Sequence, residues 1–398
     1  MPLQTLPCRV FQCGFALGAR LLPWRAPTVL SGAGSLLRLP EVFSREGASR
    51  PLVVASRRQC ADERFLALRA ALEARGVRLS VFSGVEPNPS IETVEKLAAQ
   101  YRADGCDSFL VLGGGSPIDA AKVAAARVVH PEKTVAQLGG LLKVRRSLPL
   151  FIAVPTTAGT GSEATIAAVV TGEGHRKYAV SDLCLIPRYA VLDPTLTLSL
   201  PPAVTAQTGM DALTHAVEAY LSLYYNTRET RTLAESAVRD IFRYLPVACR
   251  DGQSLTARER MLRASFDAGC AFTRASVGNV HAIAHTLGGL YGIPHGLACA
   301  VTLPLVLEDY GESVYSRLAQ LGSLVGLVGT EPERAAGFLA AIRAMNASFG
   351  FPAHFDCIQE QDLSRMAAWA SAEANPVYPV PVVYTQERFR HILERLRG

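Results

Sequence analysis

Residues 108–122 read SFLVLGGGSPIDAAK, and this stretch decides the fold. The uncharged run SFLVL predicts a buried strand, and three glycines, Gly113 to Gly115, follow it directly. Ser116 and Pro117 then open a helical segment. A strand that passes through glycines into a helix is typical of a parallel sheet wrapped by helices, with ligands beyond the carboxyl ends of the strands.

The same alternation of strand and helix extends on both sides of this stretch. Buried strands are predicted at 51–55 (PLVVA), 78–82 (RLSVF) and 150–154 (LFIAV), and helices at 61–75 and 90–103, with Ser90 as an N-cap. From about residue 203 strand signals nearly vanish and long helical periods follow. The sequence therefore predicts a Rossmann-like α/β domain with a parallel sheet, followed by an all-helical C-terminal domain.

Composition sets limits on the kind of protein. With 398 residues, 49% of them hydrophobic, the chain is too long for one compact core and can build two. The net charge of +5 is spread along the chain, so nucleic acid is not an expected partner. Nine cysteines without a CxxC pair favour a reducing compartment, and we expect the cytoplasm. No run approaches the ~18 apolar residues of a membrane span, so no integral membrane segment is expected.

Residues 1–26 form a basic N-terminal extension, since the first 40 residues hold no acidic residue. Apolar side chains recur at helical spacing, at Leu3, Leu6, Val10, Cys13, Leu17 and Leu21. Such an amphipathic segment is compatible with a targeting peptide or a membrane-surface helix. We favour a helix packed on the domain surface, because Pro2, Gly14 and Gly18 weaken it as an independent helix.

The glycine loop predicts a phosphate site. Free N–H groups at the start of the helix after Gly114, Gly115 and Ser116 favour an anion, and glycine lets a pyrophosphate approach the backbone. Asp119 is in reach of a neighbouring amide or of a ribose hydroxyl. The run is neither GxGxxG nor a P-loop, and a tight turn between strand and helix is the alternative interpretation.

A second loop of small residues follows the strand at 150–154. Residues 153–165, AVPTTAGTGSEAT, offer hydroxyls at Thr156, Thr157, Thr160, Ser162 and Thr165. Hydroxyls with glycines suit a dinucleotide, whereas the alternative is a turn capped by serine and threonine. Two such loops at strand ends of one sheet favour the dinucleotide.

Histidines gather in the helical half of the chain. GMDALTHAVEAY places Asp211 and His215 four residues apart, on one helix face, and GNVHAIAHTLGGLYGIPHG adds His281, His285 and His295. One carboxylate with imidazoles matches the ligands of divalent iron or zinc, although a lone histidine is more often a satisfied core residue. A zincin needs glutamate directly after its first histidine, and HAIAH has none, so hydride transfer suits the pattern better than peptide hydrolysis.

These four motifs, in this order, resemble the iron-containing (group III) alcohol dehydrogenase family over roughly residues 27–390. The resemblance implies a homodimer and Fe²⁺, with Zn²⁺ as an occasional substitute. It implies that Asp211, His215, His281 and His295 are the metal ligands and that His285 is a non-ligand histidine beside the nicotinamide. We therefore expect a dinucleotide-binding domain at 27–195 and a metal-binding, catalytic domain at 196–398.

The resemblance also carries over the coenzyme residues by position. They are Gly114, Gly115 and Ser116 in the first loop, Thr156, Thr157 and Thr160 in the second, Lys177 in HRKY, and Asn88 in VEPNP. Many NAD-using members have an aspartate after the first strand, where this chain has Ser56, followed by Arg57 and Arg58. Without that carboxylate NADP(H) is expected to be preferred, with NAD(H) as the alternative.

The expected function is metal-dependent hydride transfer between NAD(P) and a primary alcohol or its aldehyde. Phe272 and Val277 are candidates for an apolar wall, and Ala167 stands where some relatives place a polar residue facing the substrate. The alternatives are another polyol or hydroxyacid dehydrogenase of the same fold, a lyase resembling dehydroquinate synthase, and a non-catalytic metal-binding protein. A lyase of that kind needs a basic phosphate pocket, and the chain has no lysine from residue 196 onward.

Overall fold

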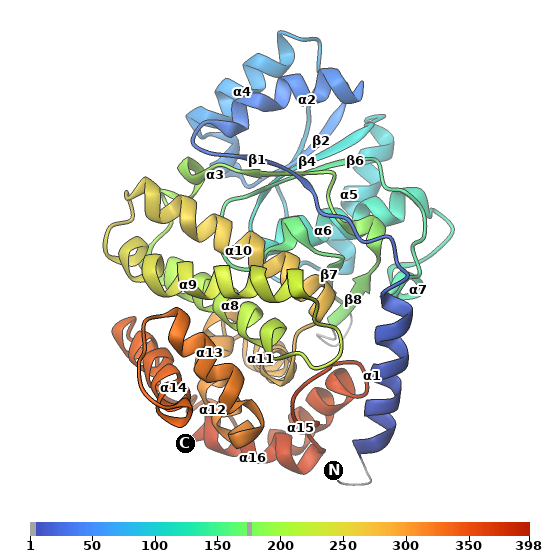
Figure 1. Ribbon diagram of the computed structural model, residues 1–398. Coiled ribbons are helices and arrows are strands. Elements are labelled where there is room, and N and C mark those ends of the chain that lie inside the picture. Colours follow the sequence, from blue (N-terminus) through green and yellow to red (C-terminus); the bar gives the residue numbers. More distant parts are fainter. Residues whose placement is uncertain (1–4, 173–176) are drawn as a thin grey trace. The chain divides into compact units, whose positions relative to one another are not determined.

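The computed structural model describes residues 5–172 and 177–398 (Figure 1). By their contacts they divide into two units. An α/β unit comprises 23–200 and 253–266, and a helical unit comprises the N-terminal segment through Leu22 with 201–252 and 267–398. The boundaries 26/27 and 195/196 stay a prediction, and Pro2 and Leu3 of the expected N-terminal helix lie outside the described residues.

The α/β unit is built on a six-stranded sheet in which every described pair of neighbours is parallel. In spatial order its strands are β1 (Thr28–Ser31), β9 (Tyr189–Leu192), β6 (Leu150–Pro155), β4 (Ser108–Gly113), β2 (Pro51–Val54) and β3 (Ser80–Phe82). Along β4, Phe109 and Val111 enter one buried cluster while Leu110 and Leu112 enter another. Both faces are therefore covered, which explains the uninterrupted apolar run of the sequence.

Helices flank this sheet in the α/β unit, as the sequence predicts. They are α2 (Leu39–Glu46), α3 (Arg57–Cys60), α4 (Glu63–Glu73), α5 (Ile91–Ala103), α6 (Gly115–Val129) and α7 (Val135–Leu138). The Ser90 hydroxyl accepts the Thr93 N–H at 3.1 Å, so the expected N-cap of α5 is confirmed.

A second sheet contains β5 (Gly140–Leu141), β8 (Lys177–Ser181) and β7 (Ala167–Thr171).

The helical unit confirms the expected change of structure after residue 200. Its helices are α1 (Leu6–Ala19), α8 (Pro202–Leu221), α9 (Arg228–Arg250), the second half of α10 (Leu255–Ala275), α11 (Asn279–Tyr291), α12 (His295–Tyr310), α13 (Tyr315–Leu324), α14 (Glu331–Ser348), α15 (Glu360–Ala374) and α16 (Gln386–Arg397). Helix α8 is buried at every position from Gly209 to Leu221 and contacts α9 and α12. A helix enclosed on all sides brings its polar residues into the core of this unit.

Helix α1 packs on the rest of the helical unit through its polar face. The apolar face, whose spacing predicted the helix, is largely exposed. The apolar side chains Leu6, Val10, Leu17 and Leu21 are 49%, 65%, 66% and 86% exposed. Arg9 and Gln12 are buried instead. The Arg9 guanidinium donates to the carbonyls of Val380 and Pro381, and the Gln12 amide donates to those of Pro376 and Tyr378. The physical reason is that this proline-rich segment has carbonyls to satisfy and few N–H groups.

A helix that crosses a bilayer must be long and mostly apolar. None of the helices that the structure describes combines these two properties.

Candidate active site

Three helices of the helical unit bring the four expected metal ligands together. Asp211 and His215 lie one turn apart on α8, His281 lies in the first turn of α11, and His295 begins α12. Asp211 Oδ1 lies 3.4 Å from His295 Nε2, 3.7 Å from His281 Nε2 and 3.8 Å from His215 Nδ1. The three imidazoles thus converge on one oxygen of the Asp211 carboxylate, and Asp211 is buried.

The donor atoms of this cluster fit a single cation. Asp211 Oδ1 and His281 Nε2 are buried and make no hydrogen bond with the described residues. Two ligands at about 2.1 Å from a tetrahedral ion lie about 3.4 Å apart, close to the separations seen here. Although burial opposes ionisation, the imidazoles of His215 and His295 hold the pKa of Asp211 below its ordinary range. A cation would satisfy both unpartnered atoms.

Close packing at Gly296 sets the position of His295. A Cβ at Gly296 would lie only 2.2 Å from the Gln207 carbonyl oxygen of α8 and 3.4 Å from the Asp211 Cβ. Any side chain there would push the start of α12 away from α8. Glycine in the sequence PHG is therefore a condition for the contact between His295 and Asp211.

Glu218, on the same helix as Asp211, supports His281 from behind. Its carboxylate accepts His281 Nδ1 at 2.5 Å and the backbone N–H groups of Gly278 and Val280, each at 2.8 Å. These bonds fix the start of α11 and direct Nε2 of His281 toward Asp211. Sequence reasoning missed Glu218, although its position three residues after His215 puts it on the same helix face.

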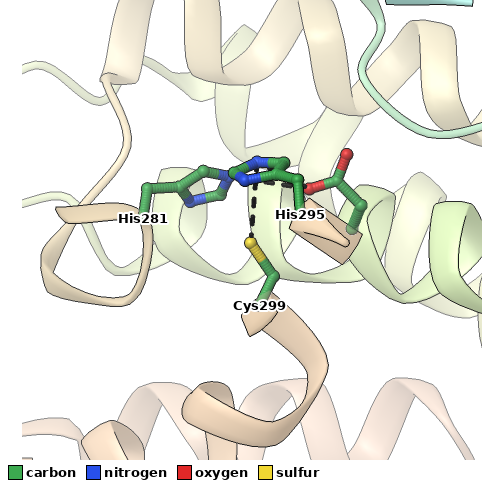
Figure 2. A group of neighbouring side chains, drawn as sticks. His281, His295 and Cys299 are labelled. Atoms are coloured by element: carbon green, nitrogen blue, oxygen red, sulfur yellow. Dashed lines mark hydrogen bonds and ion pairs between the residues drawn. The ribbon is translucent and has the colours of Figure 1, made fainter. Parts of the chain in front are cut away.

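Cys299 is a further neighbour of the cluster that the sequence reasoning missed. It lies one turn after His295 on α12, and its Sγ is 3.7 Å from His295 Nε2 (Figure 2). Asp211, His281, His295 and Cys299 each offer one ligand atom within 4.8 Å of the others. Burial raises the pKa of the Cys299 thiol to about 12. The signal in the sequence was the spacing of four residues from His295, the spacing that also links Asp211 to His215.

His285 is held by a different carboxylate. Its Nδ1 lies 2.7 Å from Glu373 on α15, and Glu373 also accepts the Tyr378 hydroxyl at 2.8 Å. Although burial opposes ionisation, His285 and this hydroxyl keep the pKa of Glu373 below its ordinary value. The His285 ring stacks on that of His295, with centroids 5.2 Å apart. His285 therefore adjoins the cluster, and neither Glu373 nor Tyr378 was anticipated from the sequence.

Of the two residues expected to form an apolar wall, Phe272 lies beside the cluster. The ring of Phe272, on α10, stacks on that of His215 with centroids 4.2 Å apart. Val277 is partly buried in the short connection before α11. Phe272 thus limits how the His215 ring can turn.

In the α/β unit, the two loops expected to bind the coenzyme follow neighbouring strands and touch each other. The glycine loop leaves β4 and the threonine loop leaves β6, which pair in register. A Cβ at Gly115 would lie 2.7 Å from Thr160 Cγ2, and a Cβ at Gly114 would lie 3.0 Å from Thr157 Oγ1. Because Gly114 and Gly115 lack side chains, the two loops can pack closely against each other. The same glycines leave the backbone N–H groups accessible to an anion.

Ser56 and Thr156 are linked through a residue that sequence reasoning missed. Ser56 is the N-cap of α3, where its hydroxyl accepts the Gln59 N–H and its own N–H donates to Gln59 Oε1. The Gln59 amide nitrogen then donates to Thr156 Oγ1 at 3.0 Å. Ser56, Arg57 and Arg58 are exposed. The ends of β2 and β6 are thereby joined beside the glycine loop.

The remaining expected coenzyme residues form a second group. Lys177 Nζ donates to Asn88 Oδ1 at 2.8 Å, and the Asn88 N–H donates to Ser116 Oγ at 3.4 Å. Asp119 was expected to reach either a neighbouring amide or a ribose hydroxyl. In the structure it accepts a hydrogen bond from the Val169 N–H at 2.9 Å. Asp119 therefore ties α6 to β7.

Lys122 lies beneath the threonine loop as a buried connector. Its ammonium donates to the carbonyl and hydroxyl of Thr165, at 2.7 and 3.0 Å, and to the Ala167 carbonyl at 3.1 Å. Burial lowers the pKa of Lys122 to about 8 and raises that of neighbouring Glu163 to about 7. Lys122 thus connects α6 to the segment between the second loop and β7.

Comparison with known proteins assigns this arrangement to a class. The family model described as iron-containing alcohol dehydrogenase matches residues 26–194, and that of the Fe-containing alcohol dehydrogenase family, C-terminal, matches 205–396. The chain belongs to the iron-containing alcohol dehydrogenase family. The resemblance inferred from its four motifs is confirmed.

Individual relatives cover most of the chain. A 1,3-propanediol dehydrogenase of Klebsiella pneumoniae is 39% identical over 310 residues, 76% of this chain and 80% of that protein. An NADPH-dependent butanol dehydrogenase of Clostridium saccharobutylicum is 36% identical over 285 residues, 71% of this chain and 73% of that protein. A solved 1,3-propanediol oxidoreductase superposes with a TM-score of 0.90 at 33% identity, covering 95% of this chain and 100% of that one.

The family and these relatives define the reaction class. The chain is an NAD(P)-dependent oxidoreductase that interconverts alcohols and aldehydes. The expected fold, an α/β domain with a parallel sheet followed by a helical region, is confirmed as well.

Proposed function

We propose that this enzyme oxidises a primary alcohol, or reduces its aldehyde, at a divalent cation held by Asp211, His215, His281 and His295. The observation that carries the proposal is the convergence of His215, His281 and His295 on Asp211 Oδ1, a buried oxygen without a hydrogen bond. We propose Fe²⁺ as the cation, in line with the family, and Zn²⁺ as its substitute because zinc competes well for nitrogen and oxygen ligands.

Each part of the site has its own task. When bound, the cation supplies positive charge that makes an alcohol hydroxyl easier to deprotonate, and nicotinamide supplies the hydride acceptor. Glu373 accepts a hydrogen bond from His285 Nδ1, so Nε2 is the atom at which His285 exchanges a proton. Tyr378 anchors Glu373, which keeps the imidazole orientation fixed. We therefore assign His285 to proton relay and substrate orientation rather than to metal binding.

We assign coenzyme binding to the α/β unit. The proposed contacts are Ser56, Asn88, Gly114, Gly115, Ser116, Asp119, Thr156, Thr157, Thr160 and Lys177. Support comes from Ser56 and the two loops, which follow β2, β4 and β6, where a parallel sheet changes strand order and ligands bind. Asn88 connects Lys177 to Ser116 of the first loop. The free N–H groups at the start of α6 suit the pyrophosphate.

We further propose that NADP(H) is preferred over NAD(H). Ser56 presents no carboxylate to repel a 2′-phosphate, and the exposed Arg57 and Arg58 follow it directly. One relative, the butanol dehydrogenase of Clostridium saccharobutylicum, is named as NADPH-dependent.

The substrate that we propose is a short primary alcohol, diol or corresponding aldehyde. The relatives named for 1,3-propanediol and butanol support this class. Phe272 beside His215 offers an apolar surface for a short carbon chain.

We also propose a cytoplasmic homodimer. None of the nine cysteines forms a disulfide, which suits a reducing compartment. Light scattering after size exclusion should give about twice the 42.6 kDa chain mass, and a monomer at enzyme concentrations would contradict the assembly.

The reaction class is tested by assay under metal control. The protein is stripped with a chelator, reloaded anaerobically with Fe²⁺ or Zn²⁺, and offered propanal, butanal and 1,3-propanediol with each coenzyme. We expect metal-dependent turnover, fastest with NADP(H). Absence of turnover with every aldehyde and diol, despite one metal per chain, would overturn the substrate proposal.

A further inference from the structure

Cys299 differs from the other cysteines in its surroundings. Among the residues that the structure describes, the group around Asp211 is the one cluster of potential metal ligands that includes a cysteine. In Figure 2 the Cys299 sulfur points from α12 toward the imidazoles of His281 and His295. Its side chain is fully buried, yet it faces ionisable groups rather than the aliphatic core.

The geometry of Cys299 matches that of a ligand. A thiolate at about 2.3 Å and an imidazole nitrogen at about 2.0–2.1 Å from one ion lie about 3.6–3.8 Å apart when the angle at the metal is about 110–120°. The separation between Cys299 Sγ and His295 Nε2 is 3.7 Å. The unpartnered, buried His281 Nε2 and Asp211 Oδ1 belong to the same compact group, so an ion shared with them is within reach of the sulfur.

We propose that the Cys299 sulfur is a further protein ligand of the metal centre and that it shifts the metal preference of this enzyme toward zinc. On binding, the thiol releases its proton to solvent and the sulfur forms a bond to the cation. Thiolate is a soft ligand that favours Zn²⁺ over Fe²⁺, whereas carboxylate and imidazole alone discriminate less. The inference rests on the metal centre proposed above and adds a sulfur donor to it.

The alternative role for Cys299 is a weak S–H hydrogen bond to His295, with no metal contact. That role makes a different spectroscopic prediction, because only a bond between sulfur and metal produces sulfur-to-metal charge transfer. Co²⁺ is a suitable probe, since it takes zinc-like geometry and its thiolate complexes absorb in the near ultraviolet.

The experiment loads metal-free protein with Co²⁺ and records the near-ultraviolet spectrum and the bound metal. The samples are the wild type, Cys299→Ser, Cys299→Ala and Cys249→Ser, the last a half-buried cysteine of α9 that serves as control. We expect a charge-transfer band in the wild type and in Cys249→Ser and its loss in both Cys299 variants. In competition between metals, the Cys299 variants should lose at least about tenfold of the preference for Zn²⁺ over Fe²⁺.

The outcomes separate the two proposals. If the wild type binds one Co²⁺ without the band, or if Cys299→Ser keeps the band, the Cys299 proposal is overturned and the metal centre stands. If the wild type binds no Co²⁺, or if Asp211→Ala binds as much as the wild type, the metal centre itself is wrong and the role of Cys299 falls with it. A wild-type spectrum without the band overturns the Cys299 proposal even if a Cys299 variant does not fold.

Discussion

The helical unit and the α/β unit build their proposed ligand sites by opposite means. The helical unit uses ionisable side chains that helices hold in place, as Glu218 does for His281. The α/β unit uses backbone and absent side chains, as where Gly115 lets the first loop approach Thr160. A cation needs few donors at fixed distances, whereas a dinucleotide needs a long surface with free N–H groups. Single substitutions should therefore have all-or-none effects in the first unit and graded effects in the second.

The largest effect is expected for Asp211→Ala, because the three imidazoles converge on an oxygen of the Asp211 carboxylate. Bound metal should be lost, and kcat/KM should fall by more than about 10³-fold. Elemental analysis and steady-state rates check this, with His354→Ala, an exposed histidine paired with Asp356, as control. NADPH binding by the α/β unit should persist. Near-normal metal and activity in Asp211→Ala would show that the cluster is not the site.

His285→Ala sharpens the distinction between ligand and relay. The variant should retain its metal while kcat falls by about 10²- to 10⁴-fold, the range for loss of a proton-transfer group. In Glu373→Gln, which keeps the side-chain shape but weakens the contact with His285 Nδ1, kcat should fall by a smaller factor. Measured loss of metal in His285→Ala would instead make His285 a ligand.

Gly115→Ala tests the packing of the two loops. The new Cβ would meet Thr160 at 2.7 Å, and overpacking of this kind costs about 1–3 kcal/mol. Coenzyme affinity should fall by about tenfold to a hundredfold, with metal content unchanged. Gly84→Ala is the matched control, since its nearest neighbours lie at 3.5 Å. Equal coenzyme Kd values for the two variants, from fluorescence titration, would refute close packing as the reason for glycine.

Ser56→Asp tests coenzyme choice at the end of β2. Aspartate keeps the N-cap of α3 and adds a charge that repels a 2′-phosphate. The wild type should prefer NADP(H) by about tenfold to a hundredfold, and the variant should lose that preference. Ser56→Asn keeps the cap without the charge and should behave as the wild type. The ratio of kcat/KM for the two coenzymes decides it, and a wild-type preference for NAD(H) would refute the proposal.

The smallest effect concerns Glu163, whose pKa burial raises. Its pKa of about 7 lies above the ordinary 4.5, so the folded state binds more protons than the unfolded state between these values. The stabilising contribution of Glu163 is present below about pH 4.5 and is lost as pH rises through 7. Glu163→Gln, which cannot ionise, should gain a few degrees in Tm relative to the wild type from pH 5 to pH 8. Parallel Tm profiles would show that Glu163 does not titrate in this range.

Much of the fold could be predicted because its signals are local. The strand, glycine loop and helix at 108–122 occupy the expected positions, and the capping role of Ser90 required only the residues next to it. Helix α1 shows the limit. Its periodicity indicated a helix, but the face that packs is the one with Arg9 and Gln12, because the carbonyls around Pro376 and Val380 need donors. Those carbonyls come from the other end of the chain.

By itself, the sequence determined the reaction class, the alternation of strands and helices, and the residue types of the proposed metal site. Asp211 and His215 share a helix face by spacing alone, since 3.6 residues make one turn. Only the tertiary structure decided which groups support them: Glu218 reaches His281 across 63 residues, and Glu373 reaches His285 across 88. It also decided that Cys299 faces the proposed metal ligands. Helical periodicity is carried by neighbours in sequence, whereas the face a helix turns to its partners depends on packing between distant segments.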